Sequence, residues 1–340
     1  FASSLKKRNI KKGDTVSIMA PNTSAMYEAH FSIPMIGAVI NTVNIRLDPK
    51  TISLILDHSD SKIIFVDSEF LPTIKEAFEI GNHKIPIIVI DDCEAFKKNI
   101  STEKLYEKFL SQGSSKDLSI TLNIDDEWFP ISLSYTSGTT GEPKGVVTHH
   151  RGAYINAISN HLIWNLKKNP IYLWTLPMFH CNGWCFPWTI AALAGTNICL
   201  RKVTAKNIFK LIKKHNVTSL CGTTVIINML IKEGTKLKKV VELMTGAAPP
   251  PASVLNKIEK QGFNITHTYG LTEVYGPAVV CEWQKDWDNL KPNNIAELKS
   301  RQGVKCYGLN DLQVVNKKTK KPVVKNGKQL GEVYMKGNTV

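Results

Sequence analysis

The chain has 340 residues, 43% hydrophobic and 21% charged, a globular composition without any apolar run of the roughly 18 residues that a membrane span needs. Its net charge of +14 raises the hypothesis of nucleic-acid binding. The lysines, however, are scattered and not interleaved with aromatic residues, so we predict solvated surfaces, no nucleic-acid partner and no membrane span.

The first part of the chain has the pattern of a parallel α/β sheet. Residues 20–41 carry apolar residues at helical spacing after a Pro-Asn turn, and residues 71–81 form a second helical pattern. Residues 61–69 and 85–92 are short runs rich in β-branched residues that end in acidic turns, as strands buried on both faces do. This alternation predicts a parallel sheet covered by helices.

The same rhythm returns after a polar stretch at 111–128, which we interpret as a junction between subdomains. Further strands are predicted at 171–177 and 196–201, and helices at 204–216, with Thr204 as N-cap, and at 250–262. Residues 312–337 alternate short β-rich runs with Asn-Gly and Lys-Pro turns, which predicts the hairpins of a small β-subdomain.

Residues 135–146, YTSGTTGEPKGV, are too polar and too rich in glycine to pack as a core strand or helix. They follow a strand-like run and therefore predict a loop at a strand end, where α/β folds bind ligands. The candidate residues are Thr136, Ser137, Gly138, Thr139, Thr140, Gly141 and Lys144. Their hydroxyls, glycine amides and ammonium group suit a phosphate, although Pro143 replaces the glycine that precedes the lysine of the common P-loop. An ordinary polar loop is the alternative.

A second candidate stretch, residues 267–277, follows the strand-like residues 263–266 and contains Thr272 and Glu273. A carboxylate beside a triphosphate is a natural Mg²⁺ ligand, because Mg²⁺ takes few protein oxygens in addition to phosphates. Tyr269 suits contact with a nucleobase or ribose. The alternative is the start of a helix in which Thr272 and Glu273 serve the cap.

Two further stretches are candidates for contacts with organic groups. Residues 244–252 run from a strand into small residues and a proline stack, which would let a flat group lie against the backbone. A plain strand-to-helix turn is the alternative there. In residues 176–188, His180 lies among large apolar side chains, either as a participant in a pocket or as a satisfied core residue.

Together, in this order, the four stretches resemble the adenylate-forming superfamily, which contains acyl-CoA synthetases, carrier-protein adenylation domains and luciferases. Residues 135–146 match its phosphate loop, residues 269–273 (YGLTE) its nucleotide and magnesium motif, and residues 331–340 a later structural motif. Within the superfamily the chain is similar, over essentially its whole length, to the plant acyl-activating enzymes. That group includes short- and medium-chain fatty acyl-CoA ligases and benzoate–CoA ligases.

The resemblance implies an α/β fold of two doubly wound mixed sheets packed with helices, plus a small β-barrel-like subdomain. It implies subdomains at residues 1–125, 126–300 and 301–340. It also leads us to expect a fragment of a large N-terminal domain, with both ends cut and the C-terminal domain absent. Such a fragment, made alone, is expected to adenylate little or nothing.

The resemblance implies a two-step reaction, in which a carboxylate attacks the α-phosphorus of ATP and the thiol of coenzyme A then displaces AMP. The implied catalytic residues are Lys144, His180, Thr272 and Glu273, with Glu273 as the Mg²⁺ ligand. The implied nucleotide site contains the phosphate-loop residues. It also contains Gly246, Ala247, Ala248, His267, Thr268, Tyr269, Gly270, Leu271 and Thr272. The implied acyl pocket contains His180, Trp184, Gly222 and Gly246, and Val274, in place of a usual threonine, predicts that the site is altered.

Three alternatives to a carboxylate–CoA ligase stay open. The first is an adenylation domain that loads a carrier protein, and the second is a non-catalytic remnant that binds nucleotide or a protein partner. The third is a nucleic-acid binder driven by the charge of +14. The expected location is cytoplasmic or peroxisomal, since a peroxisomal signal would lie at a C-terminus beyond residue 340.

Overall fold

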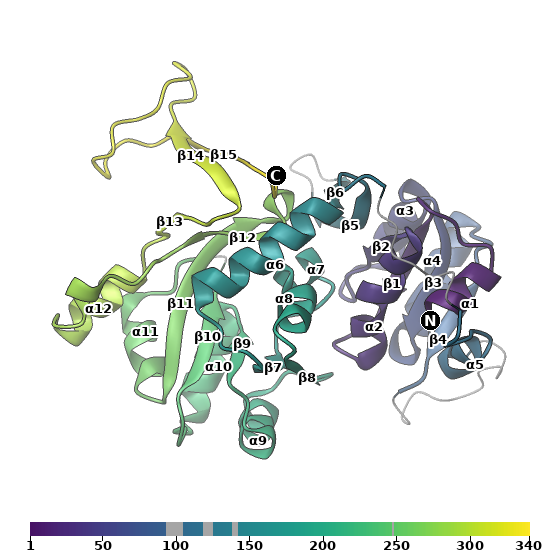
Figure 1. Cartoon of the computed structure of the whole chain (residues 1–340), viewed down its shortest axis with the longest axis horizontal. Helices are drawn as coiled ribbons and strands as arrows, with labels where there is room; N and C mark the ends of the chain where they lie inside the picture. Colours follow the sequence, from purple (N-terminus) through teal and green to yellow (C-terminus); the bar gives the residue numbers. More distant parts are fainter. Residues whose placement is uncertain (93–104, 118–124, 138–141, 247) are drawn as a thin grey trace. The chain divides into compact units, whose positions relative to one another are not determined.

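The computed structural model describes residues 1–92, 105–117, 125–137, 142–246 and 248–340, and of Ser137 only the backbone (Figure 1). The chain forms two compact units. Unit 1 contains Phe1–His150, Trp174–Pro187 and Asn197–Val203, and unit 2 contains Arg151–Leu173, Trp188–Thr196 and Thr204–Val340. The subdomain boundaries predicted at residues 125 and 300 remain a prediction.

Unit 1 is built on a six-stranded sheet in the order β4-β3-β1-β2-β5-β6. The strands are β1 (Thr15–Met19), β2 (Val39–Thr42), β3 (Ser61–Asp67), β4 (Ile87–Ile90), β5 (Pro130–Ser137) and β6 (Pro143–His149). The helices of this part are α1 (Ala2–Lys7), α2 (Ser24–Ser32), α3 (Pro49–His58), α4 (Leu71–Gly81) and α5 (Tyr106–Ser111). The first five strands of this order pair in parallel and β6 runs antiparallel to β5, which confirms a mixed sheet.

The predicted strand, helix and strand between residues 61 and 92 are confirmed as β3, α4 and β4. The helical prediction for residues 20–41 is right for α2 but wrong at its end, where Val39–Thr42 forms strand β2. Gly37, with a φ of 74°, ends the turn of 3₁₀ helix that follows α2, a conformation that glycine adopts without strain. The β-branched Val39 and Ile40 then pair with β1.

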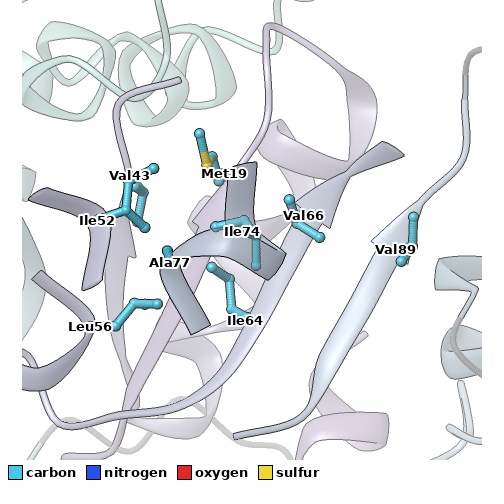
Figure 2. Packing of buried hydrophobic residues seen from close by; sticks show 9 residues of the cluster. All are labelled: Met19, Val43, Ile52, Leu56, Ile64, Val66, Ile74, Ala77 and Val89. Carbon is cyan, nitrogen blue, oxygen red and sulfur yellow. The ribbon is translucent and has the colours of Figure 1, made fainter. Parts of the chain in front are cut away.

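Apolar side chains of α3 and α4 pack on the strands of unit 1 (Figure 2). The cluster consists of Met19, Val43, Ile52, Leu56, Ile64, Val66, Ile74, Ala77 and Val89. Burying one such aliphatic side chain contributes about 1.5–3 kcal/mol, so this cluster fixes the helical layer on the sheet. Helix α3 begins where the Asp48 side chain accepts a hydrogen bond from the Thr51 amide at 3.0 Å and Pro49 occupies the first turn.

The second sheet has the order β13-β12-β11-β10-β9-β7-β8. Its strands are β7 (Ile171–Trp174), β8 (Thr196–Cys199), β9 (Ser219–Cys221), β10 (Val241–Thr245), β11 (Phe263–Leu271), β12 (Gly276–Val280) and β13 (Val304–Lys305). The remaining helices are α6 (His150–Trp164), α7 (Cys181–Trp184), α8 (Phe186–Ala192), α9 (Ala205–His215), α10 (Thr224–Glu233), α11 (Ala252–Glu259) and α12 (Pro292–Lys299). Strands β7, β9, β10 and β11 pair in parallel, and β12 and β13 continue the sheet antiparallel.

The predicted elements of this region are present. Thr204 caps α9 through its side-chain oxygen, which accepts a hydrogen bond from the Asn207 amide at 3.2 Å. The expected β-subdomain is represented by the antiparallel pair β14 (Leu309–Val315) and β15 (Glu332–Gly337). Among the described residues, no helix is both long and apolar enough to cross a membrane.

Candidate functional site

The candidate phosphate loop joins two antiparallel strands, β5 and β6, in unit 1. The register pairs Thr136 with Lys144 and Ser137 with Pro143, so the hairpin holds the two ends of the loop side by side. The predicted residues Gly138, Thr139, Thr140 and Gly141 lie outside the described residues. The Lys144 side chain is exposed, and it makes no hydrogen bond or ion pair with any other described residue.

Next to this loop, a contact between two side chains connects the hairpin to α3. The hydroxyl of Tyr135 lies 2.7 Å from Nδ1 of His58, at the end of that helix. Burial raises the pKa of Tyr135 to about 12, so its phenol stays protonated at neutral pH. Opposite Tyr135, a Cβ atom on Gly145 would lie 3.0 Å from the side chain of Leu133, which leaves little room for any other residue there. The base of the loop is thus a fixed structure.

His180 directly precedes α7, which is a rare turn of left-handed backbone in unit 1. Five consecutive residues have positive φ: Cys181 (45°), Asn182 (40°), Gly183 (56°), Trp184 (56°) and Cys185 (65°). Left-handed backbone costs roughly 1–2 kcal/mol for each residue with a Cβ atom, so packing and hydrogen bonds must hold this turn. Such strain is concentrated at functional sites, and the role predicted for His180 remains a prediction.

The side chain of His180 is exposed, whereas Trp184 in the same turn is buried. Partial desolvation of the ring lowers the pKa of His180 below its ordinary value, and the charge of Arg46 lowers it further. The ring is therefore neutral at physiological pH. A neutral ring does not bind a carboxylate by charge.

Two buried asparagines that the sequence did not single out hold this segment. The Nδ2 group of Asn22 donates to the carbonyl oxygens of Trp174 (2.8 Å) and Leu176 (3.0 Å), and its Oδ1 accepts from the Met178 amide (2.8 Å). Asn182, inside the left-handed turn, accepts hydrogen bonds from two serines of β5. No sequence signal marked either asparagine, because their partners are distant in sequence.

In unit 2, the carboxyl ends of three parallel strands bring together several predicted residues. Met244 of β10 is in register with Cys221 of β9, and Thr245 with His267 of β11. The predicted residues Gly222 and Gly246 directly follow the ends of β9 and β10, and Thr268 is the next residue of β11 after His267. The Gly222 amide donates to the Met244 carbonyl oxygen at 2.9 Å, which ties two of the ends together. Ala247 lies outside the described residues and Ala248 is exposed.

Strand β11 is longer than expected and runs through Leu271, with an irregularity between Tyr269 and Gly270. Tyr269 is half-buried and Leu271 exposed. A Cβ atom on Gly270 would lie 1.7 Å from the carbonyl oxygen of Gly276, so only glycine fits this crossing of β11 and β12. The chain then makes one turn of 3₁₀ helix, Thr272–Val274, without a side-chain cap, so the capping alternative for Thr272 and Glu273 is wrong.

Glu273 lies on this turn with its carboxylate exposed, and within the described part of the chain it forms no hydrogen bond or ion pair. Among the described residues, no group of three or more His, Cys, Asp or Glu side chains is arranged so that it could hold a metal ion. A site that offers one carboxylate fits Mg²⁺ bound mainly by phosphate and water, and does not fit a metal held by the protein alone.

The side chains of His267 and Thr268 are buried and already engaged with the backbone. Nδ1 of His267 donates to the Arg301 carbonyl oxygen at 2.8 Å, and Oγ1 of Thr268 donates to the Val279 carbonyl oxygen at 2.6 Å. Burial lowers the pKa of His267, so the ring is neutral. Both side chains therefore connect the strand to neighbouring backbone, through Nδ1 of His267 and Oγ1 of Thr268.

A separate cluster in unit 1 has the contacts of a Ser–His–Asp triad. Oγ of Ser53 lies 2.9 Å from Nε2 of His83, and Nδ1 of His83 lies 3.3 Å from a carboxylate oxygen of Asp57. Ser53 is only 3% exposed, and a Cβ atom on Gly81 would lie 2.3 Å from its hydroxyl. The hydroxyl is therefore closed to a substrate, and these contacts lock α3 to the end of α4.

The sequence profile of AMP-binding enzymes matches residues 1–340, the whole chain. The chain belongs to the AMP-binding enzyme family. Among plant relatives, a peroxisomal acetate/butyrate–CoA ligase of Arabidopsis thaliana is 48% identical over 358 residues, and a peroxisomal benzoate–CoA ligase of the same plant is 45% identical over 353. Both matches cover 100% of this chain, which spans 62% and 60% of the two relatives.

Among solved structures, the AMP-binding fold is shared with o-succinylbenzoate CoA synthetase of Bacillus subtilis, solved in complex with ATP and magnesium ion. The two chains are 21% identical, with a TM-score of 0.79, and the match covers 100% of this chain and 64% of the other. The likeness shows the fold of this family member, which is the adenylate-forming fold predicted from the sequence. The predicted site residues of the phosphate-loop candidate, His180 and Trp184 belong to unit 1, and the predicted residues Gly222, Gly246 and 267–273 to unit 2.

Proposed function

We propose that this AMP-binding enzyme is the adenylating part of an ATP- and Mg²⁺-dependent carboxylate–CoA ligase. The observation that carries the proposal is the β5–β6 hairpin, which holds Thr136 opposite Lys144 at the two ends of a loop rich in glycine and hydroxyl groups. The relatives named as acetate/butyrate– and benzoate–CoA ligases support it, since they match along the entire chain.

In the proposed first step, a carboxylate oxygen of the acid bonds to the α-phosphorus of ATP, and the bond to pyrophosphate breaks. Negative charge grows on the leaving pyrophosphate, and the ammonium group of Lys144 with the loop hydroxyls would stabilise it. Thr272 would contact the α-phosphate. Glu273 would hold Mg²⁺, which supplies positive charge to the phosphates when bound.

In the proposed second step, the thiolate of coenzyme A attacks the acyl carbonyl carbon, and AMP leaves with the bonding electrons. Ala247, Ala248 and Tyr269 would border the adenine, and His180, Trp184, Gly222 and Gly246 would line the acyl pocket. The acid class we propose is a short- or medium-chain fatty acid or a small aromatic acid, in keeping with the named relatives. Both of these relatives are named as peroxisomal enzymes, which supports a peroxisomal location for this protein.

The proposal is tested with the complete gene product, ATP, Mg²⁺, coenzyme A and a panel from acetate to benzoate. We expect one acyl-CoA and one AMP for each ATP consumed. Adenylate formation without acyl-CoA would favour a carrier-protein adenylation domain. ATP binding without any product would favour the non-catalytic remnant.

Replacing Lys144 by alanine is expected to lower kcat for adenylation by about 10²–10³, the usual loss when one preorganised positive donor is removed from developing charge. Folding should be unaffected, because the side chain is exposed. The matched control is Lys62→Ala, another exposed lysine of unit 1, whose ion pair with Asp60 lies outside the hairpin. Equal rates for the two variants in pyrophosphate exchange would remove Lys144 from the site.

Replacing Glu273 by glutamine is expected to raise the Mg²⁺ concentration for half-maximal rate about tenfold or more, because even indirect partners of a metal ligand change affinity by that factor. The measurement is a Mg²⁺ titration of the adenylation rate at fixed ATP. Glu282→Gln, another exposed carboxylate of unit 2, serves as control. Superimposable titrations for the wild type and Glu273→Gln would exclude Glu273 as a ligand.

A further inference from the structure

The geometry of unit 1 assigns a role to a residue outside the predicted site: we propose that Asn182 is a positioning residue that fixes His180 relative to strand β5, which carries Thr136. The inference rests on the proposed ligase function and deepens it. Asn182 itself touches neither nucleotide nor acid in this proposal. It acts through His180 on one side and β5 on the other.

The amide of Asn182 is wholly buried and connects three elements. Its Oδ1 accepts from Oγ of Ser132 at 2.6 Å and from Oγ of Ser134 at 3.1 Å, two residues on the same face of β5. Its Nδ2 points to Oγ1 of Thr42, at the end of β2, at 3.5 Å. All four side chains are at most 4% exposed, so water does not replace these contacts.

The backbone of Asn182 explains why an asparagine suits this position. Its φ of 40° and ψ of 51° are left-handed, and asparagine tolerates this region better than other residues with a Cβ atom. Glycine would fit the backbone but would leave the two serine hydroxyls without their shared acceptor. Asn182 therefore both adopts the left-handed backbone and makes the amide's hydrogen bonds. Any other side chain would lose part of this combination.

The same anchor sets the distance between two parts of the proposed site. His180 lies two residues before Asn182, and Thr136, the first predicted loop residue, lies two residues after Ser134. Because the Asn182 amide joins these segments directly, displacement of the left-handed turn would displace His180 from Thr136. Reactions between two bound groups are sensitive to such shifts, and about 1 Å of misplacement can cost 10²-fold in rate.

Contacts on both sides of His180 hold the chain around the left-handed turn in place. Oγ1 of Thr42 donates to the Phe179 carbonyl oxygen at 2.9 Å, directly before His180. A Cβ atom on Gly183 would lie 2.8 Å from the Trp174 ring, so the turn packs closely on that side chain. The chain before His180 is thus tied to β2, and the chain after it to β5 through Asn182.

The test uses Asn182→Gly in the complete gene product, which keeps the left-handed backbone and removes the amide. We expect kcat for adenylation to fall about 10- to 100-fold while KM for ATP changes less than about threefold. The double variant Ser132→Ala/Ser134→Ala, which removes the anchor from the other side, should give the same pattern. Asn41→Ala is the matched control, since Asn41 is equally buried and its Nδ2 donates to Ser17 at 2.8 Å.

A readout specific to positioning is the effect of His180→Ala on kcat/KM for the acid. If Asn182 acts through His180, that effect is large in the wild type and shrinks toward none in the Asn182→Gly background. If His180→Ala and Asn182→Gly lowered kcat/KM for the acid by independent factors, so that the double variant showed their product, the inference would be overturned. It would also be overturned if Asn182→Gly adenylated as fast as Asn41→Ala at equal folded fraction. Absence of acid-dependent adenylation in the wild type would instead refute the proposed function.

Discussion

Replacing Gly270 by alanine is expected to disrupt the end of β11 and to abolish adenylation by the complete gene product. The added Cβ atom would lie 1.7 Å from the carbonyl oxygen of Gly276 and 2.7 Å from its carbonyl carbon. Both are backbone atoms, so no side chain can rotate away, and β11 and β12 must separate. Overpacking of this kind costs about 1–3 kcal/mol or more, and here it displaces Thr272 and Glu273 directly.

The measurement is the urea midpoint of the variant together with its adenylation rate. Gly234→Ala is the matched control, because Gly234 also lies in unit 2, has a φ of 74° and has no atom within 4 Å of the Cβ position. It adds the left-handed strain of alanine, roughly 1–2 kcal/mol, without a clash. If Gly270→Ala were no less stable and no slower than Gly234→Ala, the crossing of β11 and β12 would not be as described.

Replacing Arg201 by methionine is expected to destabilise unit 1 by about 3–5 kcal/mol, the cost of leaving a buried carboxylate unpaired. Arg201 contacts both carboxylate oxygens of Asp67, at 2.6 and 2.7 Å, and also Glu69 (2.8 Å) and Asp92 (2.7 Å). Asp67 is wholly buried at the end of β3. Without the guanidinium, this carboxylate has lost both water and its counter-charge.

Denaturant unfolding of the complete gene product checks this expectation. The control Lys62→Met breaks the pair between Lys62 and Asp60, which is equally short at 2.7 Å but lies at the surface, and it should barely change the midpoint. An Arg201→Met midpoint equal to that of the control would show that the three carboxylates do not depend on Arg201. Adenylation at low temperature should persist, since these side chains lie outside the proposed site.

The alternation of strands and helices could be predicted because strands such as β3 are buried on both faces and therefore consist of apolar, β-branched residues. The acidic turns after β3 and β4 were also visible, but their partner Arg201 follows 134 residues after Asp67. Ion pairs between such distant residues depend on the folded sheet and leave no local pattern. Strand β6 was missed for another reason: its first residues are Pro143, Lys144 and Gly145, which have low strand propensity and are held by pairing with β5.

The left-handed turn after His180 could not be predicted, since no propensity favours five such residues in a row. A weaker signal did exist in β5, where Ser132 and Ser134 alternate with apolar residues in a strand-like run. Buried hydroxyls need partners, so this alternation indicated a polar contact. It did not indicate which residue, because Asn182 comes 48 residues after Ser134.

The most direct measurement is the exchange of labelled pyrophosphate into ATP by the complete gene product, with Mg²⁺ and with or without a carboxylic acid. Ligase chemistry through an acyl-adenylate predicts exchange that requires an acid such as acetate, butyrate or benzoate and that falls sharply in Lys144→Ala. Exchange with none of the acids by a folded, ATP-binding protein, or exchange unaffected by Lys144→Ala, would contradict it.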